Sequence, residues 1–210
     1  MYKGAYDMKI KAVTVGMFAT NCYLVYCPKT AEGIIVDPGA NGKLIASCIK
    51  ELKIKLKYLI NTHGHIDHIG ANRKIKEDFK VPILLSENDL QLYHNPGYGL
   101  SFVLKKQPAP DWFVNEGDEL RFGECSLTIV TTPGHTPGGV SLIGNNELFC
   151  GDTLFAGSIG RTDLPGGSYP TLIKSIKERL MTLPGHLNVY PGHGPATTIS
   201  EEAESNVFIT

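Results

Sequence analysis

The chain has 210 residues, of which 42% are hydrophobic, so it is long enough to bury a sizeable core. Its 20 basic and 21 acidic residues leave a formal net charge of −1, which provides no global basic field for a nucleic-acid backbone. No run approaches the roughly 18 apolar residues of a membrane span, so we expect one domain over residues 1–210 that binds neither nucleic acid nor a membrane.

The first half of the chain predicts a β-meander followed by β-α-β units. Polar and apolar residues alternate, as in half-buried strands, over residues 9–16, 21–26 and 33–36. Apolar residues then recur at the spacing of one helix face. These are Leu44, Ile45, Cys48, Ile49 and Leu52. A strand, a helix, a strand and a short helix are expected next, over residues 58–61, 70–79, 82–85 and 87–94.

The second half is rich in short strands. Residues 95–112 are broken by proline and glycine, and this segment is either a lid or substrate wall or an ordinary surface excursion. Strands are expected over residues 119–122, 125–131, 140–143 and 147–150. A helix, a strand and a final helix follow, over residues 171–183, 187–190 and 200–206. This order is best accommodated by an α/β fold, a four-layer αββα sandwich with two mixed sheets inside and helices outside.

Four potential metal ligands fall within six residues, directly after the apolar stretch 57–60: His63, His65, Asp67 and His68. Side chains alternate in an extended segment, so His63 and His65 point the same way and can grip one cation. Asp67 and His68 fall near the predicted start of a helix, where the chain turns. This geometry indicates two metals rather than one.

Three further candidates each follow a predicted strand and lie beside glycines: His135, Asp152 and His193. Loops beyond the carboxyl ends of strands gather ligands in α/β sheets, so these residues can converge on one crevice. A chance arrangement would need five of the chain's seven histidines to fall in such places. The other two, His94 and His186, lie outside any ligand-like spacing and are interpreted as surface or hydrogen-bonded residues.

The five cysteines are an odd number without CxxC spacing: Cys22, Cys27, Cys48, Cys125 and Cys150. This argues against a disulfide framework and a thiolate zinc cluster, and it predicts a reducing, cytoplasmic setting. Cys150 lies close to Asp152 in the sequence, but a buried and inert thiol is expected there.

The ligand pattern, in this order along the chain, resembles the metallo-β-lactamase superfamily. The stretches 151–155 and 160–161 look like the hydroxyacylglutathione hydrolases (glyoxalase II), particularly their short bacterial relatives. The resemblance implies two divalent metals, with zinc first among zinc, iron and manganese. It assigns His63, His65 and His135 to the first metal, Asp67, His68 and His193 to the second, and Asp152 to a bridge between them.

The sequence departs from that family in two places. Full-length glyoxalase II enzymes carry a C-terminal helical domain that grips glutathione, and we expect no such domain here because the chain stops at Thr210. Arg161 stands where the family has a lysine, while Asp163 replaces a tyrosine. Arg161 is therefore either a substrate-binding residue for an anionic tail or a surface arginine paired with Asp163.

The chemistry of such a site favours hydrolysis. Two divalent cations, two coordinating aspartates and one bridging hydroxide leave a formal charge of about +1, which attracts developing oxyanions. A bound metal brings the pKa of water from about 15.7 to about 7. A thiolate, with a pKa near about 8.5, leaves without an acid, and Asp67 is the one candidate catalytic residue for proton transfer. We therefore predict a thioesterase that acts on small hydroxyacyl thioesters such as S-lactoylglutathione.

The same set of metal ligands is compatible with several other functions. The persulfide dioxygenases of this superfamily share the histidine motif and a similar Gly-Arg-Thr-Asp segment but use one iron and oxygen. Hydrolysis of another ester, a lactone, a β-lactam or a phosphodiester needs the same metal chemistry. A metal-stabilised binding module without catalysis is the remaining hypothesis, although structural zinc sites are usually closed single-metal sites. The sequence does not indicate an oligomeric state.

Overall fold

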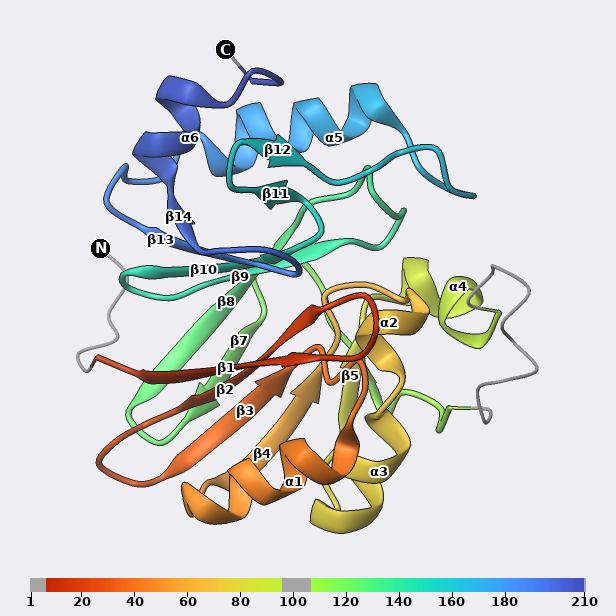
Figure 1. The fold of residues 1–210 in the computed structure, drawn as a ribbon, viewed down its shortest axis with the longest axis vertical. Coiled ribbons are helices and arrows are strands. Elements are labelled where there is room, and N and C mark those ends of the chain that lie inside the picture. Colours follow the sequence, from red (N-terminus) through yellow and green to blue (C-terminus); the bar gives the residue numbers. More distant parts are fainter. Residues whose placement is uncertain (1–6, 96–106, 210) are drawn as a thin grey trace.

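The computed structural model describes residues 7–95 and 107–209, which form two six-stranded sheets packed face to face (Figure 1). Sheet A has the order β1-β2-β3-β4-β5-β6, and sheet B has the order β14-β13-β10-β9-β8-β7. Helices α1 and α3 cover the outer face of sheet A, while α5 and α6 cover that of sheet B. The predicted four-layer αββα sandwich is confirmed.

The strands of sheet A are β1 (Lys9–Val15), β2 (Thr20–Tyr26), β3 (Glu32–Val36), β4 (Lys55–Ile60), β5 (Ile83–Leu85) and β6 (Trp112–Phe113). Those of sheet B are β7 (Glu119–Phe122), β8 (Cys125–Thr131), β9 (Val140–Ile143), β10 (Glu147–Gly151), β13 (Asn188–Pro191) and β14 (Thr197–Thr198). A separate hairpin pairs β11 (Leu154–Phe155) with β12 (Ser158–Ile159).

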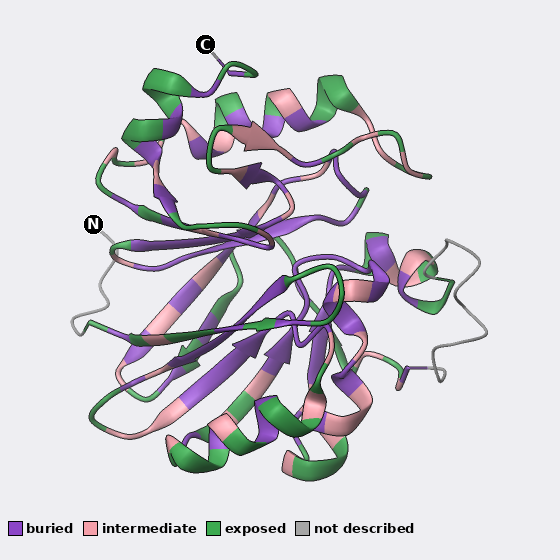
Figure 2. Ribbon diagram, viewed as in Figure 1, coloured by how far each residue is buried: buried purple, intermediate pink, exposed green. Residues whose placement is uncertain are grey.

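The helices are α1 (Gly42–Glu51), α2 (Ile66–Ile69), α3 (Asn72–Phe79), α4 (Leu90–His94), α5 (Tyr169–Ser175) and α6 (Ile199–Ser205). A 3₁₀ turn, η1 (Glu87–Asp89), precedes α4, and a π-helical turn, η2 (Ile176–Leu180), continues α5. Figure 2 shows buried residues concentrated where the sheets face each other and exposed residues on the outer helix faces.

The main core lies between the two sheets. On β2, Tyr23 and Val25 point into this core, while Cys22 and Leu24 pack under the helices of sheet A. Both faces of the strand are therefore buried, as expected for a strand inside a four-layer sandwich. Phe149 of β10 is fully buried, and its ring centroid lies 5.3 Å from that of Tyr23.

The topology brings the carboxyl ends of several strands to one edge. Strands β3, β4 and β5 run parallel to one another in sheet A, and β10 runs parallel to β13 in sheet B. A backbone hydrogen bond from Asn21 N to Gly192 O, 2.7 Å long, joins the sheets at this edge. The loops after these strands therefore open toward one place between the sheets.

The structure differs from the sequence prediction in several details. Leu44, predicted on the buried face of α1, is 49% exposed, and Ala46 is buried instead. The helix predicted over residues 171–183 begins earlier, at Tyr169, and its continuation η2 ends at Leu180. The short strands β6, β11, β12 and β14 were not predicted, because two residues are too few to show an alternating pattern.

Two further predictions concern what the chain lacks. Among the described residues, no helix is long and apolar enough to cross a membrane. All five cysteines lie in the described part of the chain and are free thiols. Burial raises the pKa of Cys150 to about 12, in agreement with the predicted inert thiol. The predicted lid or wall, residues 95–112, falls largely on residues 96–106, outside the described residues.

Phe149→Ala tests the aromatic core. We expect the free energy of unfolding to fall by about 3–5 kcal/mol, because the deleted ring leaves a cavity that the sheets cannot close. Phe208→Ala is the matched control, since Phe208 is 42% exposed, and its effect should stay below about 1 kcal/mol. Denaturant unfolding measures both values, and equal losses for the two variants would contradict the described core.

Candidate metal centre

Three histidines form the first group of the site. His63 follows β4, His65 caps the N-terminus of α2, and His135 lies in the loop after β8. One ring nitrogen from each lies within 4.8 Å of the others, and His65 Nδ1 is 2.9 Å from His135 Nε2. Three imidazoles from two sheets thus converge on one point.

A second group contains Asp67, His68 and His193. The short helix α2 carries Asp67 and His68, so the helix begins among the ligand candidates rather than after them. His193 follows β13, and its Nε2 lies 3.2 Å from Asp67 Oδ2 and 3.3 Å from His68 Nε2. This group also fits within 4.8 Å.

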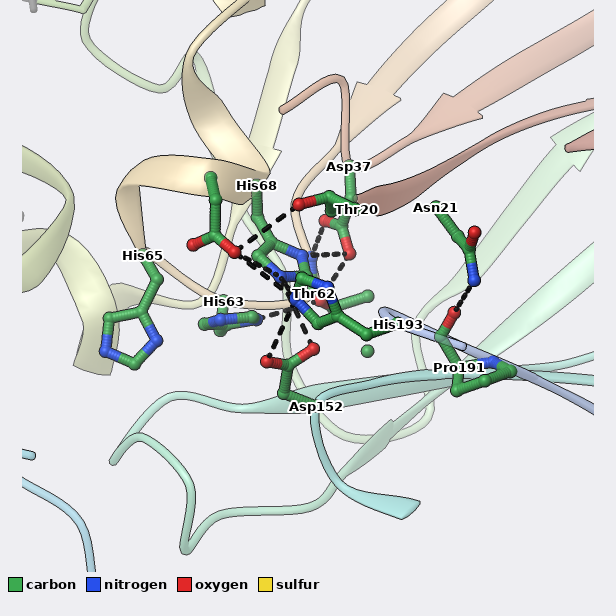
Figure 3. A network of polar contacts seen from close by, with 12 residues as sticks. Thr20, Asn21, Asp37, Thr62, His63, His65, His68, Asp152, Pro191 and His193 are labelled. Atoms are coloured by element: carbon green, nitrogen blue, oxygen red, sulfur yellow. Dashed lines mark hydrogen bonds and ion pairs between the residues drawn. The ribbon is translucent and has the colours of Figure 1, made fainter. Parts of the chain in front are cut away.

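Asp152 lies between the two groups (Figure 3). Its Oδ1 is 3.3 Å from His68 Nε2, and its Oδ2 is 3.5 Å from His193 Nε2 and 3.6 Å from His135 Nε2. Gly192 makes this approach possible, because a β-carbon there would lie 2.1 Å from Asp152 Oδ1. The structure therefore brings all seven predicted residues together, and Asp152 contacts histidines of both groups.

Hydrogen bonds from Nδ1 turn four of the five imidazoles inward. The Nδ1 atoms of His68, His135 and His193 lie 2.9, 2.7 and 3.0 Å from oxygens of Asp37, Arg161 and Phe18, respectively. These oxygens only accept, so each Nδ1 carries a proton, and each Nε2 is the nitrogen directed into the site, where it presents a lone pair in the neutral ring.

A hydroxyl group orients the His63 ring in the same way. Thr62 Oγ1 donates to Asp37 Oδ2 at 2.6 Å and lies 3.1 Å from His63 Nδ1, so its remaining lone pairs can accept from that nitrogen. His63 Nε2 then has a lone pair, and this atom is buried without a hydrogen-bond partner. Such an orphaned buried acceptor is costly unless a cation satisfies it.

The electrostatics of the two groups differ. Burial and the neighbouring imidazoles lower the pKa of His63, and burial lowers that of His65 to about 4. Burial also opposes charge at His68, but the carboxylates of Asp152 and Asp37 outweigh it and raise the His68 pKa. His63 and His65 therefore present neutral nitrogens, and the second group attracts positive charge.

The carboxylates of Asp67 and Asp152 are held ionised. Burial by itself raises the pKa of Asp152, yet the nearby His68, His135 and His193 lower it well below the usual range. The pKa of Asp67 is also lowered, because the hydrogen bond with His193 outweighs burial. Neutral imidazole nitrogens and ionised carboxylate oxygens are the donors that zinc, iron and manganese accept, so the residues fit divalent metal ions.

Asp37 is a site residue that the sequence analysis missed. It follows β3 in a left-handed conformation with φ of 50°, and its carboxylate accepts hydrogen bonds from Thr62 N and Thr62 Oγ1 at 2.7 and 2.6 Å. A carboxylate oxygen of Asp37 also lies within 4.8 Å of ligand atoms of His63 and His68. Both oxygens already accept hydrogen bonds, however, one from Thr62 N and the other from Thr62 Oγ1 and His68 Nδ1. Its place after a strand at the same edge is the signal that could have identified it.

Asp89 is a second missed residue, and it joins the two loops that carry the three-histidine group. Its carboxylate accepts hydrogen bonds from Gly64 N at 2.8 Å, Thr136 Oγ1 at 2.8 Å and Gly138 N at 2.6 Å. Asp89 is fully buried. The neighbours of three predicted ligands are thus tied to one side chain, for which the sequence holds no local signal.

Arg161 lies at the mouth of the site. It lines the cavity beside His135 and Asp152, and its Nε and Nη2 donate to Asp163 at 2.8 and 2.7 Å. The ion-pair alternative is therefore what the structure shows, and a substrate-binding role stays a prediction. His94 and His186 are exposed and belong to neither group, as predicted.

Comparisons with known proteins agree with this geometry. Residues 15–193 match the family described as the metallo-beta-lactamase superfamily, and the chain belongs to this superfamily of metal-dependent hydrolases. It is 40% identical to the hydroxyacylglutathione hydrolase GloC of Haemophilus influenzae, over 96% of this chain and 98% of that protein.

Two solved structures share the fold closely. The BLEG-1 B3 metallo-beta-lactamase is 33% identical and superposes with a TM-score of 0.90, over 96% of this chain and 100% of that one. TTHA1623, solved in a di-iron-bound form, is 34% identical with a TM-score of 0.86, over 94% of this chain and 99% of that one. These similarities confirm the family resemblance that the sequence motif indicated.

Asp89→Asn tests the link between the two histidine loops. The side-chain amide of asparagine has one acceptor oxygen, so it cannot replace both carboxylate oxygens, and buried donors such as Gly64 N or Gly138 N lose their partner. We therefore expect the free energy of unfolding to fall by about 2–3 kcal/mol. Metal affinity should fall roughly 10- to 100-fold, because the loops no longer hold the ligands in place. Denaturant unfolding and metal titration measure these changes.

Asp78→Asn is the matched control for this test. Asp78 is a surface carboxylate on α3 that accepts from Lys74 at 2.6 Å, and such pairs contribute less than about 1 kcal/mol. If Asp89→Asn behaves like Asp78→Asn in both measurements, Asp89 does not organise the site.

Proposed function

We propose that the protein is a dinuclear metal-dependent hydrolase that cleaves hydroxyacyl thioesters, with zinc as the first candidate metal and iron or manganese as alternatives. The observation that carries the proposal is the position of Asp152 between the three-histidine group and the Asp67, His68 and His193 group. The 40% identity to a hydroxyacylglutathione hydrolase supports the substrate class.

The assignment of ligands follows the two groups. His63, His65 and His135 would hold one cation, and Asp67, His68 and His193 would hold the other. Asp152 would contact both, because its oxygens lie near His135, His68 and His193. Such a pair of cations lowers the pKa of water, so that hydroxide is available near neutral pH, and polarises a carbonyl oxygen.

The remaining chemistry belongs to the side chains around the cavity. Asp67 lines it with an ionised carboxylate, and Thr20 Oγ1 donates to Asp67 Oδ2 at 3.4 Å, which leaves Oδ1 to accept a proton from the nucleophile. No other carboxylic acid lines the described wall besides Asp152, whose pKa is also lowered. A leaving group that needs no acid, such as a thiolate, fits this site best.

The setting and partners follow from the same reasoning. Free cysteines fit a reducing compartment, and we propose a cytoplasmic protein with a small-molecule thioester as its substrate. The formal charge of −1 gives no support to a nucleic-acid partner.

The test is elemental analysis of protein purified without added metal, followed by assays with S-lactoyl thioesters of different thiols. We expect about two divalent ions per chain, release of free thiol and no oxygen uptake. Absence of thiol release from the metal-loaded protein would reject the proposal. One iron per chain with oxygen uptake would instead identify a persulfide dioxygenase.

Asp152→Asn and Asp67→Asn separate catalysis from a purely structural metal site. Loss of either charge should lower kcat/KM for thioester hydrolysis by roughly 100- to 1,000-fold, since the centre loses an anionic ligand. Asp78→Asn is again the surface control and should keep full activity. Near-normal turnover by both site variants, with the fold intact by circular dichroism, would be incompatible with the assigned roles.

A further inference from the structure

The cavity in front of the candidate metal centre has mainly apolar walls. Its volume is about 590 Å³, which is within the range of small-molecule sites. Asp67, His135, Asp152 and His193 form its floor. Its apolar lining comes from Phe18, Ile66, Phe155, Ile159 and Leu164, and we call these five residues the apolar wall.

The apolar wall is attached to the metal-ligand candidates. The Phe155 ring lies edge-on to the His193 imidazole, with centroids 6.2 Å apart and an interplanar angle of 76°. Phe18 is 53% exposed, and its carbonyl oxygen is 3.0 Å from His193 Nδ1. The Phe155 ring and the Phe18 backbone are therefore both tied to His193, and both residues line the cavity beside the candidate metal centre.

A hairpin presents part of this wall. In β11–β12, Leu154 pairs with Ile159 and Phe155 pairs with Ser158. Leu154 is fully buried in the core under α5, which anchors the hairpin, while Phe155 is only partly buried and faces the cavity. The apolar side chains are thus held in place rather than free to withdraw from a ligand.

The charge around the cavity opening is balanced. Among the described residues of the lining, Arg161 is the one lysine or arginine, and both of its hydrogen bonds to Asp163 offset its charge. A thiol with two carboxylates, such as glutathione, therefore finds no net positive charge on this wall. Burial of apolar area therefore contributes more to the free energy of binding at this wall than attraction between charges does.

We infer that the apolar wall is a specificity site for the acyl part of the substrate. This inference rests on the proposed thioesterase function and narrows its substrate class. Among hydroxyacyl thioesters, the preferred substrates are those whose acyl group continues as an apolar chain and whose thiol is uncharged. Each added methylene that reaches the wall should improve affinity roughly three- to fourfold.

Non-hydrolysable thioethers test this inference without requiring turnover. S-butyl- and S-hexyl-N-acetylcysteamine, and the same alkyl groups on glutathione, are titrated by calorimetry into metal-loaded and metal-free protein. We expect hexyl compounds to bind roughly tenfold more tightly than butyl compounds, with no advantage for glutathione. Equal affinity for both chain lengths, or tenfold tighter binding of S-hexylglutathione than of its N-acetylcysteamine counterpart, would overturn the inference.

Variants assign the effect to the wall. Phe155→Ala and Phe18→Ala should each reduce the hexyl-over-butyl preference by threefold or more, while Phe155→Leu should keep most of it. Trp112→Ala is the control, because Trp112 is 55% exposed on β6 and does not line this cavity. Elemental analysis confirms that each variant binds as much metal as the unmodified protein. An unchanged preference in both alanine variants would exclude the wall as the specificity site.

The two proposals fail in different ways. Chain-length-dependent thioether binding without any thiol release from thioesters would refute the proposed function and leave the apolar wall as a binding site for another apolar ligand. Thiol release from thioesters with no dependence on acyl length would support the function and refute the specificity site.

Discussion

The structure depends on one electrostatic constraint, the convergence of buried nitrogen lone pairs and carboxylates on one point. The Nε2 atoms of His63, His68, His135 and His193 face inward because their Nδ1 atoms are committed to outer oxygens. His63 Nε2 and Asp152 Oδ1 are buried without hydrogen-bond partners. Neutral imidazole nitrogens and ionised carboxylates cannot satisfy one another at this point, and divalent cations can satisfy both.

The rest of the fold holds these acceptors in position. Parallel strands bring loops from both sheets to one edge, and outer oxygens then set the direction of four of the five imidazole rings. Asp37 and Asp89 support the ligands from behind. Asp37 orients His68 and Thr62. Asp89 joins the loops at Gly64 and Gly138. Such support keeps the ligands preorganised, so that little reorganisation is needed when metal binds.

Chemistry and selectivity are separated in space. The floor of the cavity supplies charge and metal-ligating atoms, which suit carbonyl hydrolysis in general, whereas the apolar wall supplies apolar contact area. The β11–β12 hairpin and the turn that carries Phe18 form much of that wall. Differences in such walls are a physical means by which one fold serves different substrates.

The sequence by itself determined the layer order, most strands and helices, and all seven converging residues, because alternation, helical spacing and ligands after strands are local patterns. It did not determine the exposure of Leu44, the two-residue strands, or the roles of Asp37 and Asp89. Asp89 bonds to groups 25 and 49 positions away. Only the tertiary structure decided these features, because they depend on which distant segments pack together and on which face of α1 meets the sheet.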